Sequence, residues 1–403
     1  MKGAEMKIPT NVKAILDRLL ASGFDAYVVG GSLRDALLGK EAHDWDVTSS
    51  ARPEEVIALF SDMRVIPTGL KHGTVTVMSE GDPIEITTFR TDGKYSDSRH
   101  PESVTFAARV EDDLSRRDFT VNAMAYNESR GLVDLFGGRD DLASRTIRCV
   151  GDPEKRFSED ALRIMRAFRF SSQLDFDIHP ETLDGAIRMR EGLKNIARER
   201  IGSEFLRLLC GASPEKALSK MDKILEFVID KTIDTQRFAW LSSIECDAIS
   251  RLALLLCGSS ENELIAASHS LRLSSKQKGR LIKLAFPPSA DELTDLTPVG
   301  ARRIIARYGE DSVAAASISV ALYGADAVSL DVLRRVEAEN PCVAISQLAV
   351  DGSDLISENI AKGKQVGEVL SRLLDAVIED PSLNTRESLI NLAKDWKIQP
   401  TVE

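Results

Sequence analysis

The sequence has few of the features that mark zinc-binding, disulfide-bonded or membrane proteins. Its five cysteines are scattered and form no CxxC pair, and its five histidines form no cluster, so we expect neither a zinc site nor a disulfide framework. No run of about eighteen apolar residues occurs, which excludes a membrane-spanning helix. The first residues lack the apolar segment of a secretory signal. These absences together predict a cytoplasmic protein without a membrane partner.

Net positive charge is also lacking, because the chain carries a formal charge of −11. This balance argues against a protein that coats nucleic acid through general electrostatic attraction. It leaves open an enzyme with a local basic groove on an acidic body, so the placement of the arginines matters more than their number. Over 403 residues, 43% hydrophobic and 29% charged residues are typical of a soluble globular chain with several domains.

The pattern of apolar residues changes near Asp152-Pro153. Before this point short strand-like runs alternate with helices, and "GTVTVM" and "IEITTF" are joined by "SEGD", which is typical of a hairpin connection. After it nearly every segment has a helical period; "SEDALRIMRAFRFSSQL", for example, predicts one helix capped by Ser158. We therefore expect an α+β fold, with a mixed sheet in the N-terminal part followed by an all-α region.

Two alternating carboxylates, Asp44 and Asp46, predict a metal site. Residues at i and i+2 on a strand point to the same face, and two convergent carboxylates suit Mg²⁺, which keeps other ligand positions for water or phosphate. With two ions about 4 Å apart, one would activate an attacking hydroxyl and the other a leaving pyrophosphate. Glu85 in "PIEITTF" is a possible third ligand if its strand lies alongside. An isolated DxD is more often a solvated turn, so the neighbouring residues decide the interpretation.

Those neighbours indicate a triphosphate. Gly30-Gly31 ends a buried strand and precedes a helix, so free backbone N–H groups at the helix start would face an anion. Arg34, one turn into that helix, adds a cation at the same place. We expect Gly31 and Arg34 to bind the triphosphate from one side while Asp44 and Asp46 hold the metal on the other.

"GGSLRDALLG…HDWDVTSSARPEEV" resembles the opening motif of the tRNA nucleotidyltransferase/poly(A) polymerase family, in its bacterial-type class II branch within the DNA polymerase β superfamily. Four further stretches resemble the later motifs of that family, in the expected order: "EDDLSRRDFTVNAMAY", "DLFGGRDDL", "RFSEDALRIMRAFRF" and "RERIGSEFLRLL". The resemblance implies a polymerase-β-like nucleotidyltransferase head at 1–147, a helical neck with the base pocket at 148–210, a helical body at 211–290 and a helical, tRNA-binding tail at 291–403. It gives no expectation about oligomeric state.

The fourth motif predicts a pocket that selects a base. A fixed carboxylate at Asp160 would accept a hydrogen bond from the exocyclic amine of cytosine or adenine and repel the carbonyl of guanine or uracil. Arg163 beside it would donate to the same edge, and together they would select CTP and ATP without a template, as the resemblance also implies. Arg166 and Arg169 would meet phosphates or the primer strand, and Arg117 would contact the nucleotide from the head. The alternative is a solvated helix held by pairs such as Glu159–Arg163.

Two other stretches remain open to more than one interpretation. In "RERIGSE", a structural ion-pair network without a chemical role is expected, formed by Arg198, Glu199, Arg200 and Glu204. "FRTDGKYSDSRHP" is expected to be a surface loop. The resemblance implies that such a loop, here with Arg90, Asp92 and Tyr95, serves the switch from C to A addition.

The family contains several activities. "TGLKHGTVTV" resembles the CCA-adding pattern, which favours Mg²⁺-dependent addition of C, C and A to the 3′ end of tRNA from CTP and ATP. A poly(A) polymerase or a partial CC- or A-adding enzyme is the nearest alternative, and a non-catalytic RNA-binding protein is the alternative from another class.

Overall fold

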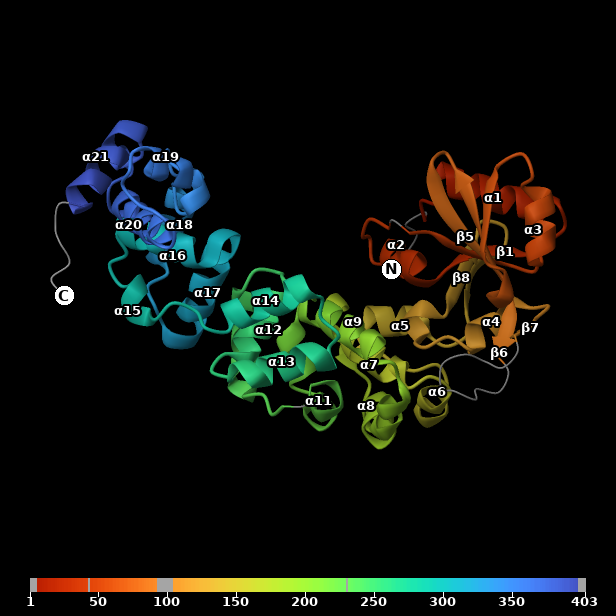
Figure 1. Cartoon of the computed structure of the whole chain (residues 1–403). Helices are drawn as coiled ribbons and strands as arrows, with labels where there is room; N and C mark the ends of the chain where they lie inside the picture. Colours follow the sequence, from red (N-terminus) through yellow and green to blue (C-terminus); the bar gives the residue numbers. More distant parts are fainter. Residues whose placement is uncertain (1–5, 43, 93–103, 230, 398–403) are drawn as a thin grey trace. The chain divides into compact units, whose positions relative to one another are not determined.

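The computed structural model describes residues 6–42, 44–92, 104–229 and 231–397. The chain forms two compact units, of which the first comprises residues 1–232 and 270–272 and the second comprises residues 233–269 and 273–403 (Figure 1). The expected four-part division into head, neck, body and tail is finer than this one and stays a prediction. Among the described residues, no helix is long and apolar enough to cross a membrane.

The N-terminal part of the first unit is built on a mixed seven-stranded sheet with the order β3-β4-β5-β2-β1-β8-β9. Its only parallel pair among these strands is β2 with β5. The strands are β1 (Ala26–Val29), β2 (Asp46–Ser49), β3 (Arg64–Gly69), β4 (Thr74–Ser79), β5 (Asp82–Thr88), β8 (Met124–Asn127) and β9 (Gly131–Asp134). Two small two-stranded sheets flank it: β6 (Arg90–Asp92) with β7 (Val104–Phe106), and β10 (Thr146–Ile147) with β11 (Asp177–Ile178). The expected α+β head with a mixed sheet is confirmed.

The hairpin predicted at "SEGD" is confirmed. β4 and β5 pair in antiparallel fashion as far as Ser79 and Asp82, so the connection consists of Glu80 and Gly81 alone. Both have positive φ angles, 54° and 96°, which is the backbone of a two-residue turn that matches the strand twist. The turn fixes the register of β5 and with it the position of Glu85.

The central strand β1 is buried along its whole length. On one face Tyr27 and Val29 pack with Phe89 and with Val110 and Leu114 of a short helix. Five helices accompany the sheet: α1 (Thr10–Ala21), α2 (Gly30–Leu37), α3 (Pro53–Leu59), α4 (Val110–Ser115) and α5 (Gly138–Ala143). The 3₁₀ segments here are η1 (Leu70–His72) and η2 (Thr120–Asn122).

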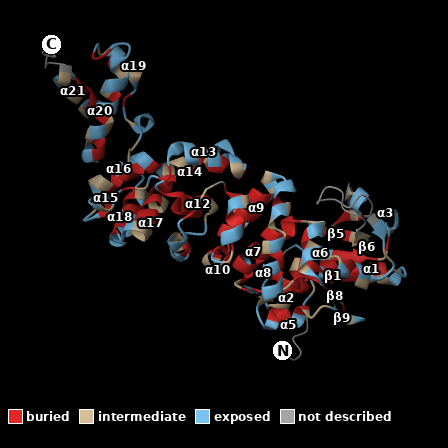
Figure 2. Cartoon of the chain, turned by 90° about the horizontal axis from the view of Figure 1, so that it is seen from below, coloured by how far each residue is buried: buried red, intermediate tan, exposed pale blue. Residues whose placement is uncertain are grey.

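The rest of the first unit is helical, as expected. Its helices are α6 (Pro153–Glu159), α7 (Leu162–Leu174), α8 (Pro180–Arg188), η3 (Arg190–Asn195), α9 (Arg198–Leu209), α10 (Pro214–Leu218) and α11 (Asp222–Val228). Figure 2 shows α7 largely in the colour of buried residues. The single helix predicted across this motif is wrong: the chain breaks between α6 and α7 at Asp160, which has extended φ and ψ angles of −141° and 103°. Ser158 therefore caps no helix, and the Asp160 carboxylate accepts from the Leu162 N–H instead, at 3.0 Å.

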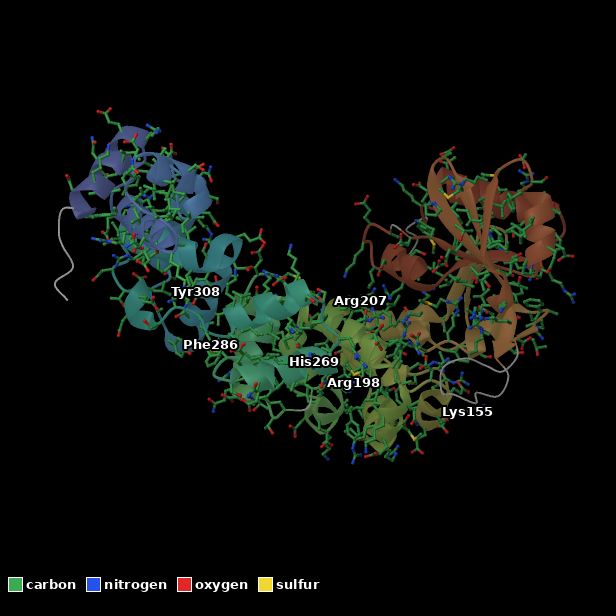
Figure 3. All side chains as sticks on the ribbon, in the orientation of Figure 1. Lys155, Arg198, Arg207, His269, Phe286 and Tyr308 are labelled. Carbon is green, nitrogen blue, oxygen red and sulfur yellow. The ribbon has the colours of Figure 1, made fainter. Side chains whose placement is uncertain are left out.

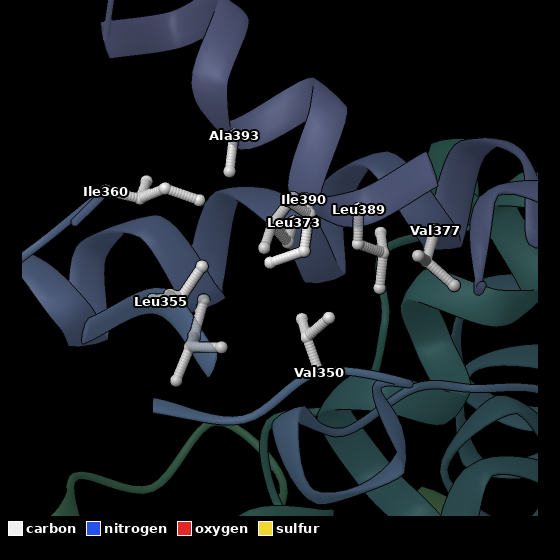
Figure 4. Packing of buried hydrophobic residues seen from close by; sticks show 9 residues of the cluster. Val350, Leu355, Ile360, Leu373, Val377, Leu389, Ile390 and Ala393 are labelled. Atoms are coloured by element: carbon white, nitrogen blue, oxygen red, sulfur yellow. The ribbon is translucent and has the colours of Figure 1, made fainter. Parts of the chain in front are cut away.

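The second unit is entirely helical where the structure describes it. It contains η4 (Thr235–Ser243), α12 (Ala248–Leu256), most of α13 (Glu261–Ser270), α14 (Ser275–Leu284), α15 (Ala290–Leu293), α16 (Pro298–Tyr308), η5 (Gly309–Asp311), α17 (Ser312–Tyr323), α18 (Val328–Ala338), η6 (Ile345–Gln347), α19 (Gly352–Ser357), α20 (Gln365–Glu379), η7 (Pro381–Leu383) and α21 (Arg386–Lys397). A core of aliphatic side chains, with Leu373 and Leu389 fully buried, joins α19, α20 and α21 (Figure 4). Arg302 of α16 donates to the carbonyls of Ile378 and Glu379 and so caps the C-terminal end of α20.

Candidate active site

The predicted site residues converge on one pocket of about 480 Å³ in the first unit. Its lining includes seven arginines against four carboxylates, so a chain of net charge −11 presents a basic cavity here. Most of the predicted residues are among them: Gly31, Arg34, Asp46, Glu85, Arg90, Arg117, Asp160, Arg163 and Arg166.

Two carboxylates stand together at the sheet end of this pocket. Asp46 opens β2, and its parallel neighbour across the ladder is Glu85 of β5, so the two side chains project from the same face of the sheet. Although Asp46 keeps contact with solvent, desolvation by the surrounding protein raises its pKa to about 6, and the charges of Glu85 and Asp44 act in the same direction, whereas Arg117 opposes them. This accumulation of negative charge is what a bound divalent cation would relieve.

Asp44 does not line this pocket, although its charge acts on Asp46, and its role as a metal ligand stays a prediction. The i and i+2 rule applies only within a strand, and β2 begins at Asp46, so the premise that both aspartates share one strand is wrong. Asp44 is exposed and lines a second hollow of about 330 Å³, together with Trp45 and Asp82. Among the described residues, no group of three or more His, Cys, Asp or Glu could hold a metal ion. The carboxylates that face the main pocket near the sheet are Asp46 and Glu85.

Helix α2 begins beside Asp46, directly after the residue of β1 that pairs with it. Gly30 has a φ of 78°, and a Cβ atom there would lie 3.5 Å from Arg117 Nη1 and 3.6 Å from Asp46 Oδ2. Both are ordinary contact distances, so the glycine is needed for the positive φ with which the chain enters the helix beside these two charged groups. Arg34 follows one turn later; its Nη1 donates to Asn122 Oδ1 at 2.8 Å, and its other nitrogens pair with Asp35.

A buried carboxylate, Asp118, connects the two walls of the pocket. Its Oδ2 accepts from Arg166 Nε at 2.8 Å, and its Oδ1 accepts from Asn122 Nδ2 at 3.2 Å. Burial alone would raise the pKa of Asp118, but the Arg166 guanidinium outweighs it and lowers the value to about 2. Asn122 also accepts from Arg34, so an unbroken chain of hydrogen bonds runs from α2 to α7.

Arg117 is held in the same manner. Asp113 in α4 is fully buried and pairs with Arg116 at 2.7 Å and with Arg117 at 3.1 Å. Burial would raise the pKa of Asp113, yet the two guanidinium groups together lower it. The Nε of Arg117 is buried and has no hydrogen-bond partner among the described residues. The guanidinium of Arg117 is therefore fixed at the pocket wall, and its Nε–H group can still donate a hydrogen bond.

The residues at the break between α6 and α7 form the far wall. Asp160 lines the pocket, and Arg163 donates through Nη1 to Glu159 at 2.9 Å and through Nη2 to the carbonyl of Arg116 at 2.8 Å. The predicted pair Glu159–Arg163 thus exists and spans the break. Its arginine also ties α7 to the segment that carries Arg117.

Among the other predicted residues that the structure describes, Arg169 falls elsewhere. Arg169 does not line the pocket; it is buried and pairs with Glu204 of α9 at 2.5 Å. Asp92 ends β6, where its backbone pairs with Val104. Tyr95 lies outside the described residues.

Several residues of the lining were missed from the sequence: Arg116, Asp118, Asn122, Phe170 and Arg200. Phe170 lies beneath the guanidinium groups of Arg34 and Arg166, each 5.3 Å from the ring centroid. The signal for the first three was the run "RRDFTVN", of which only Arg117 was interpreted. Arg200 was assigned to a structural network, yet it faces Asp160 at 3.5 Å.

Three family models match the chain. The "Poly A polymerase head domain" matches residues 26–148, the "Probable RNA and SrmB- binding site of polymerase A" matches residues 175–225, and the tRNA nucleotidyltransferase domain 2 matches residues 304–393. These matches confirm the family resemblance seen in the sequence motifs.

Full-length relatives narrow the assignment. The chain is 37% identical over 410 residues to a CCA-adding enzyme of Leuconostoc citreum, covering 97% of this chain and 98% of the relative. It is 34% identical to a CCA-adding enzyme of Enterococcus faecalis, with 94% of each chain covered. The crystal structure of the Bacillus stearothermophilus CCA-adding enzyme in complex with CTP superposes with a TM-score of 0.82 at 32% identity over 96% of each chain. The chain belongs to the CCA-adding enzyme family.

Proposed function

We propose that the 480 Å³ pocket is where this CCA-adding enzyme transfers nucleotides from CTP and ATP to the 3′ end of tRNA. The observation that carries the proposal is the placement of an acidic pair, Asp46 and Glu85, opposite a set of arginines in one cavity. That combination suits a substrate that is a polyanion accompanied by a divalent cation. The relative from Bacillus stearothermophilus has been solved with CTP, which supports the same class of substrate.

Asp46 would hold a divalent cation, Mg²⁺ in our proposal, with Glu85 beside it and Asp44 close enough to influence its charge. Mg²⁺ is usually bound by one or two carboxylates together with substrate phosphates and water, so a cage of three protein ligands is not required. When bound, such a cation neutralises phosphate charge and makes the attacking hydroxyl more acidic. The raised pKa of Asp46 fits this role, because a site that disfavours its own negative charge gains by taking up a cation.

The N-terminus of α2 and Arg34 would bind the triphosphate. Gly30 lets the helix start lie beside Asp46 and Arg117, so backbone N–H groups and a guanidinium flank the proposed metal position. Arg34 is held by Asn122 and Asp35, which fixes its direction before substrate arrives. The protein would therefore act by positioning and by neutralising charge.

Asp160 would select the base. Its carboxylate is held by the Leu162 N–H, and as an anion it can only accept hydrogen bonds, which favours the exocyclic amines of cytosine and adenine. The contact of Arg163 with the base edge stays a prediction, because in this structure its Nη groups donate to Glu159 and to the Arg116 carbonyl. Arg166, paired with Asp118, would face the phosphates or the primer, whereas Arg169 would support α7 through Glu204.

The proposed partner is tRNA, and the proposed location is the cytoplasm. Support for tRNA comes from the tRNA nucleotidyltransferase domain matched at 304–393 and from the identity of the full-length relatives. The predicted switching role of Arg90, Asp92 and Tyr95 remains part of the proposal.

A primer-extension assay tests the proposed function. tRNA transcripts ending at the discriminator base, at C and at CC are incubated with CTP, ATP or both, and the products are sized. We expect addition to stop after a complete CCA end. Long A tails would indicate a poly(A) polymerase, arrest after CC a partial enzyme, and absence of extension a binding protein; each would overturn the proposal.

A further inference from the structure

Two arginines on the same helix, Arg198 and Arg200, have very different surroundings. Arg198 donates from Nε, Nη1 and Nη2 to the carbonyls of Ser270, Phe227 and Val228, at 2.9, 2.6 and 2.6 Å. A guanidinium saturated by carbonyls in this way serves to hold chain segments together. Arg200, two residues later, makes a single ion pair, with Asp160 at 3.5 Å.

One donor of Arg200 is left over. Its Nη1 is buried and has no hydrogen-bond partner among the described residues, although the side chain lines the main pocket. A buried donor without a partner costs about 1–3 kcal/mol, and at Arg200 this donor belongs to a side chain that lines the pocket, whereas Arg198 donates all its bonds to carbonyls. The contrast indicates that Arg200 faces a ligand.

The partner of Arg200 is the carboxylate that we propose selects the base. Asp160 Oδ1 accepts from the Leu162 N–H at 3.0 Å, and Oδ2 is the atom that faces Arg200 Nη2. One oxygen is therefore fixed by the backbone of α7 and the other by α9. This arrangement leaves the carboxylate little freedom to rotate.

Helix α9 holds Arg200 firmly in place. At its start Arg198 makes the three carbonyl contacts, and one turn after Arg200 the carboxylate of Glu204 pairs with Arg169 of α7. Gly202 lies against the backbone of Leu271, where a Cβ atom would come within 2.3 Å of the carbonyl oxygen. The helix is thus anchored on both sides of Arg200.

We propose that Arg200 is a specificity-determining positioning residue for nucleotide selection. Its Nη2 orients the Asp160 carboxylate, and its Nη1 is available to an acceptor atom of the bound nucleotide. The inference rests on the proposed function, since it concerns how the same pocket distinguishes cytosine and adenine from uracil and guanine.

The chemistry follows from the donors and acceptors present. A carboxylate accepts hydrogen bonds and has no proton to donate to a base carbonyl, so the direction in which its oxygens point decides which base edge it can bind. Without Arg200 the Oδ2 atom loses its partner, and the carboxylate can turn toward the other guanidinium groups of the pocket, such as that of Arg166. The discrimination against uracil would then weaken even if the fold is kept.

The experiment compares kcat/KM for CTP and for UTP, each alone, on a tRNA transcript that ends at the discriminator base. Arg200→Met removes the charge and keeps the length of the side chain, whereas Arg200→Lys keeps the charge. Loss of one charge-assisted hydrogen bond predicts a fall of about tenfold or more in the CTP to UTP ratio for Arg200→Met. Arg200→Lys is expected to recover part of that ratio.

Arg207→Met is the matched control, because Arg207 lies exposed on the same helix, two turns beyond Arg200 (Figure 3). It should leave the CTP to UTP ratio unchanged.

An unchanged CTP to UTP ratio in Arg200→Met, with kcat lowered equally for both nucleotides, would show a merely structural role and overturn the inference. If Arg200→Met does not fold, the test uses Arg200→Lys. A CTP to UTP ratio and a CTP affinity equal to those of the wild type in Arg200→Lys would count against the proposal. Failure of the wild type to add CTP would instead overturn the proposed function.

Discussion

Asp46 and Glu85 are direct neighbours on the parallel strands β2 and β5, and their carboxylates share one face of the sheet. We expect Asp46→Asn to lower nucleotide addition by about 10³-fold, because several kcal/mol of transition-state stabilisation depend on the cation at this position. Glu85→Gln should have a smaller effect. Rates of CMP addition to a tRNA transcript measure both changes. Glu80→Gln, on the exposed hairpin turn, is the control and should retain wild-type rates.

tRNA binding offers an independent check of the same pair. Because Asp46 faces the nucleotide pocket, Asp46→Asn should leave the affinity for tRNA largely intact, as measured by filter binding. An equal loss of tRNA affinity and of activity would mean that Asp46 supports the fold rather than the cation.

The raised pKa of Asp46 predicts a pH dependence of stability in the absence of divalent cations. A folded-state pKa of about 6, above the ordinary value of 3.8, means that the charged form is disfavoured in the folded protein. The free energy of unfolding of the wild type, relative to that of Asp46→Asn, is therefore lowest above pH 6 and increases as the pH falls from 6 toward 4. Thermal unfolding in EDTA measures this. At pH 7.5 the melting temperature of Asp46→Asn should be higher than that of the wild type, and at pH 5 the difference between the two melting temperatures should be smaller.

Addition of Mg²⁺ at pH 7.5 should reverse this order. A bound cation favours the ionised carboxylate, so it should raise the melting temperature of the wild type and have little effect on Asp46→Asn. A melting temperature that rises equally in both proteins would show that the cation binds elsewhere.

The local parts of the fold were predictable from the sequence, because they depend on neighbouring residues. A buried strand was expected directly before Gly30-Gly31, and β1 is found there, and the hairpin between β4 and β5 followed from its turn residues. The break at Asp160 was not predicted, because the apolar spacing on either side continues as though one helix ran through it. Asp160 leaves the helix because its carboxylate satisfies the free N–H of Leu162.

The site was predictable only in part, for a related reason. Asp46 and Arg34 belong to one short motif, so their proximity follows from the sequence. Asp118 and Arg200 gain their roles from partners in distant segments, Arg166 and Asp160, and no spacing rule connects such pairs. Arg169 was expected to meet phosphates or the primer strand, but its side chain pairs with Glu204 of the distant helix α9 instead.

Asp118 provides a prediction about stability. Its removal leaves Arg166 and Asn122 without their partner in a buried position, and breaking a buried ion pair costs about 3–5 kcal/mol. We expect Asp118→Asn to lower the free energy of unfolding by an amount in that range, measured by urea denaturation. In the double variant with Arg166→Met the loss should be smaller than the sum of the two single losses. Strict additivity would mean that the two side chains are not coupled.

The ion pair of Asp118 and Arg166 also predicts that the stability of the protein decreases in acid. The folded-state pKa of Asp118 is about 2, below its ordinary value, so its contribution to stability is complete above about pH 4 and is lost as the pH falls toward 2. The difference in unfolding free energy between wild type and Asp118→Asn should therefore shrink over that interval. A difference that stays constant down to pH 2 would contradict the assignment of the pair.

Two glycines, one at the start of α2 and one just after its end, allow the effect of backbone strain to be measured separately from the effect on the active site. Gly30 and Gly39 both have positive φ angles, 78° and 71°, so an alanine at either costs about 1–2 kcal/mol of strain. A Cβ atom at Gly39 would meet nothing within 4 Å, whereas one at Gly30 would contact Arg117 and Asp46. We expect Gly30→Ala and Gly39→Ala to lower the unfolding free energy similarly, but only Gly30→Ala to raise KM for CTP and lower kcat. Equal activity in the two variants would mean that the helix start does not contact the triphosphate, and the binding site would have to lie farther toward α7.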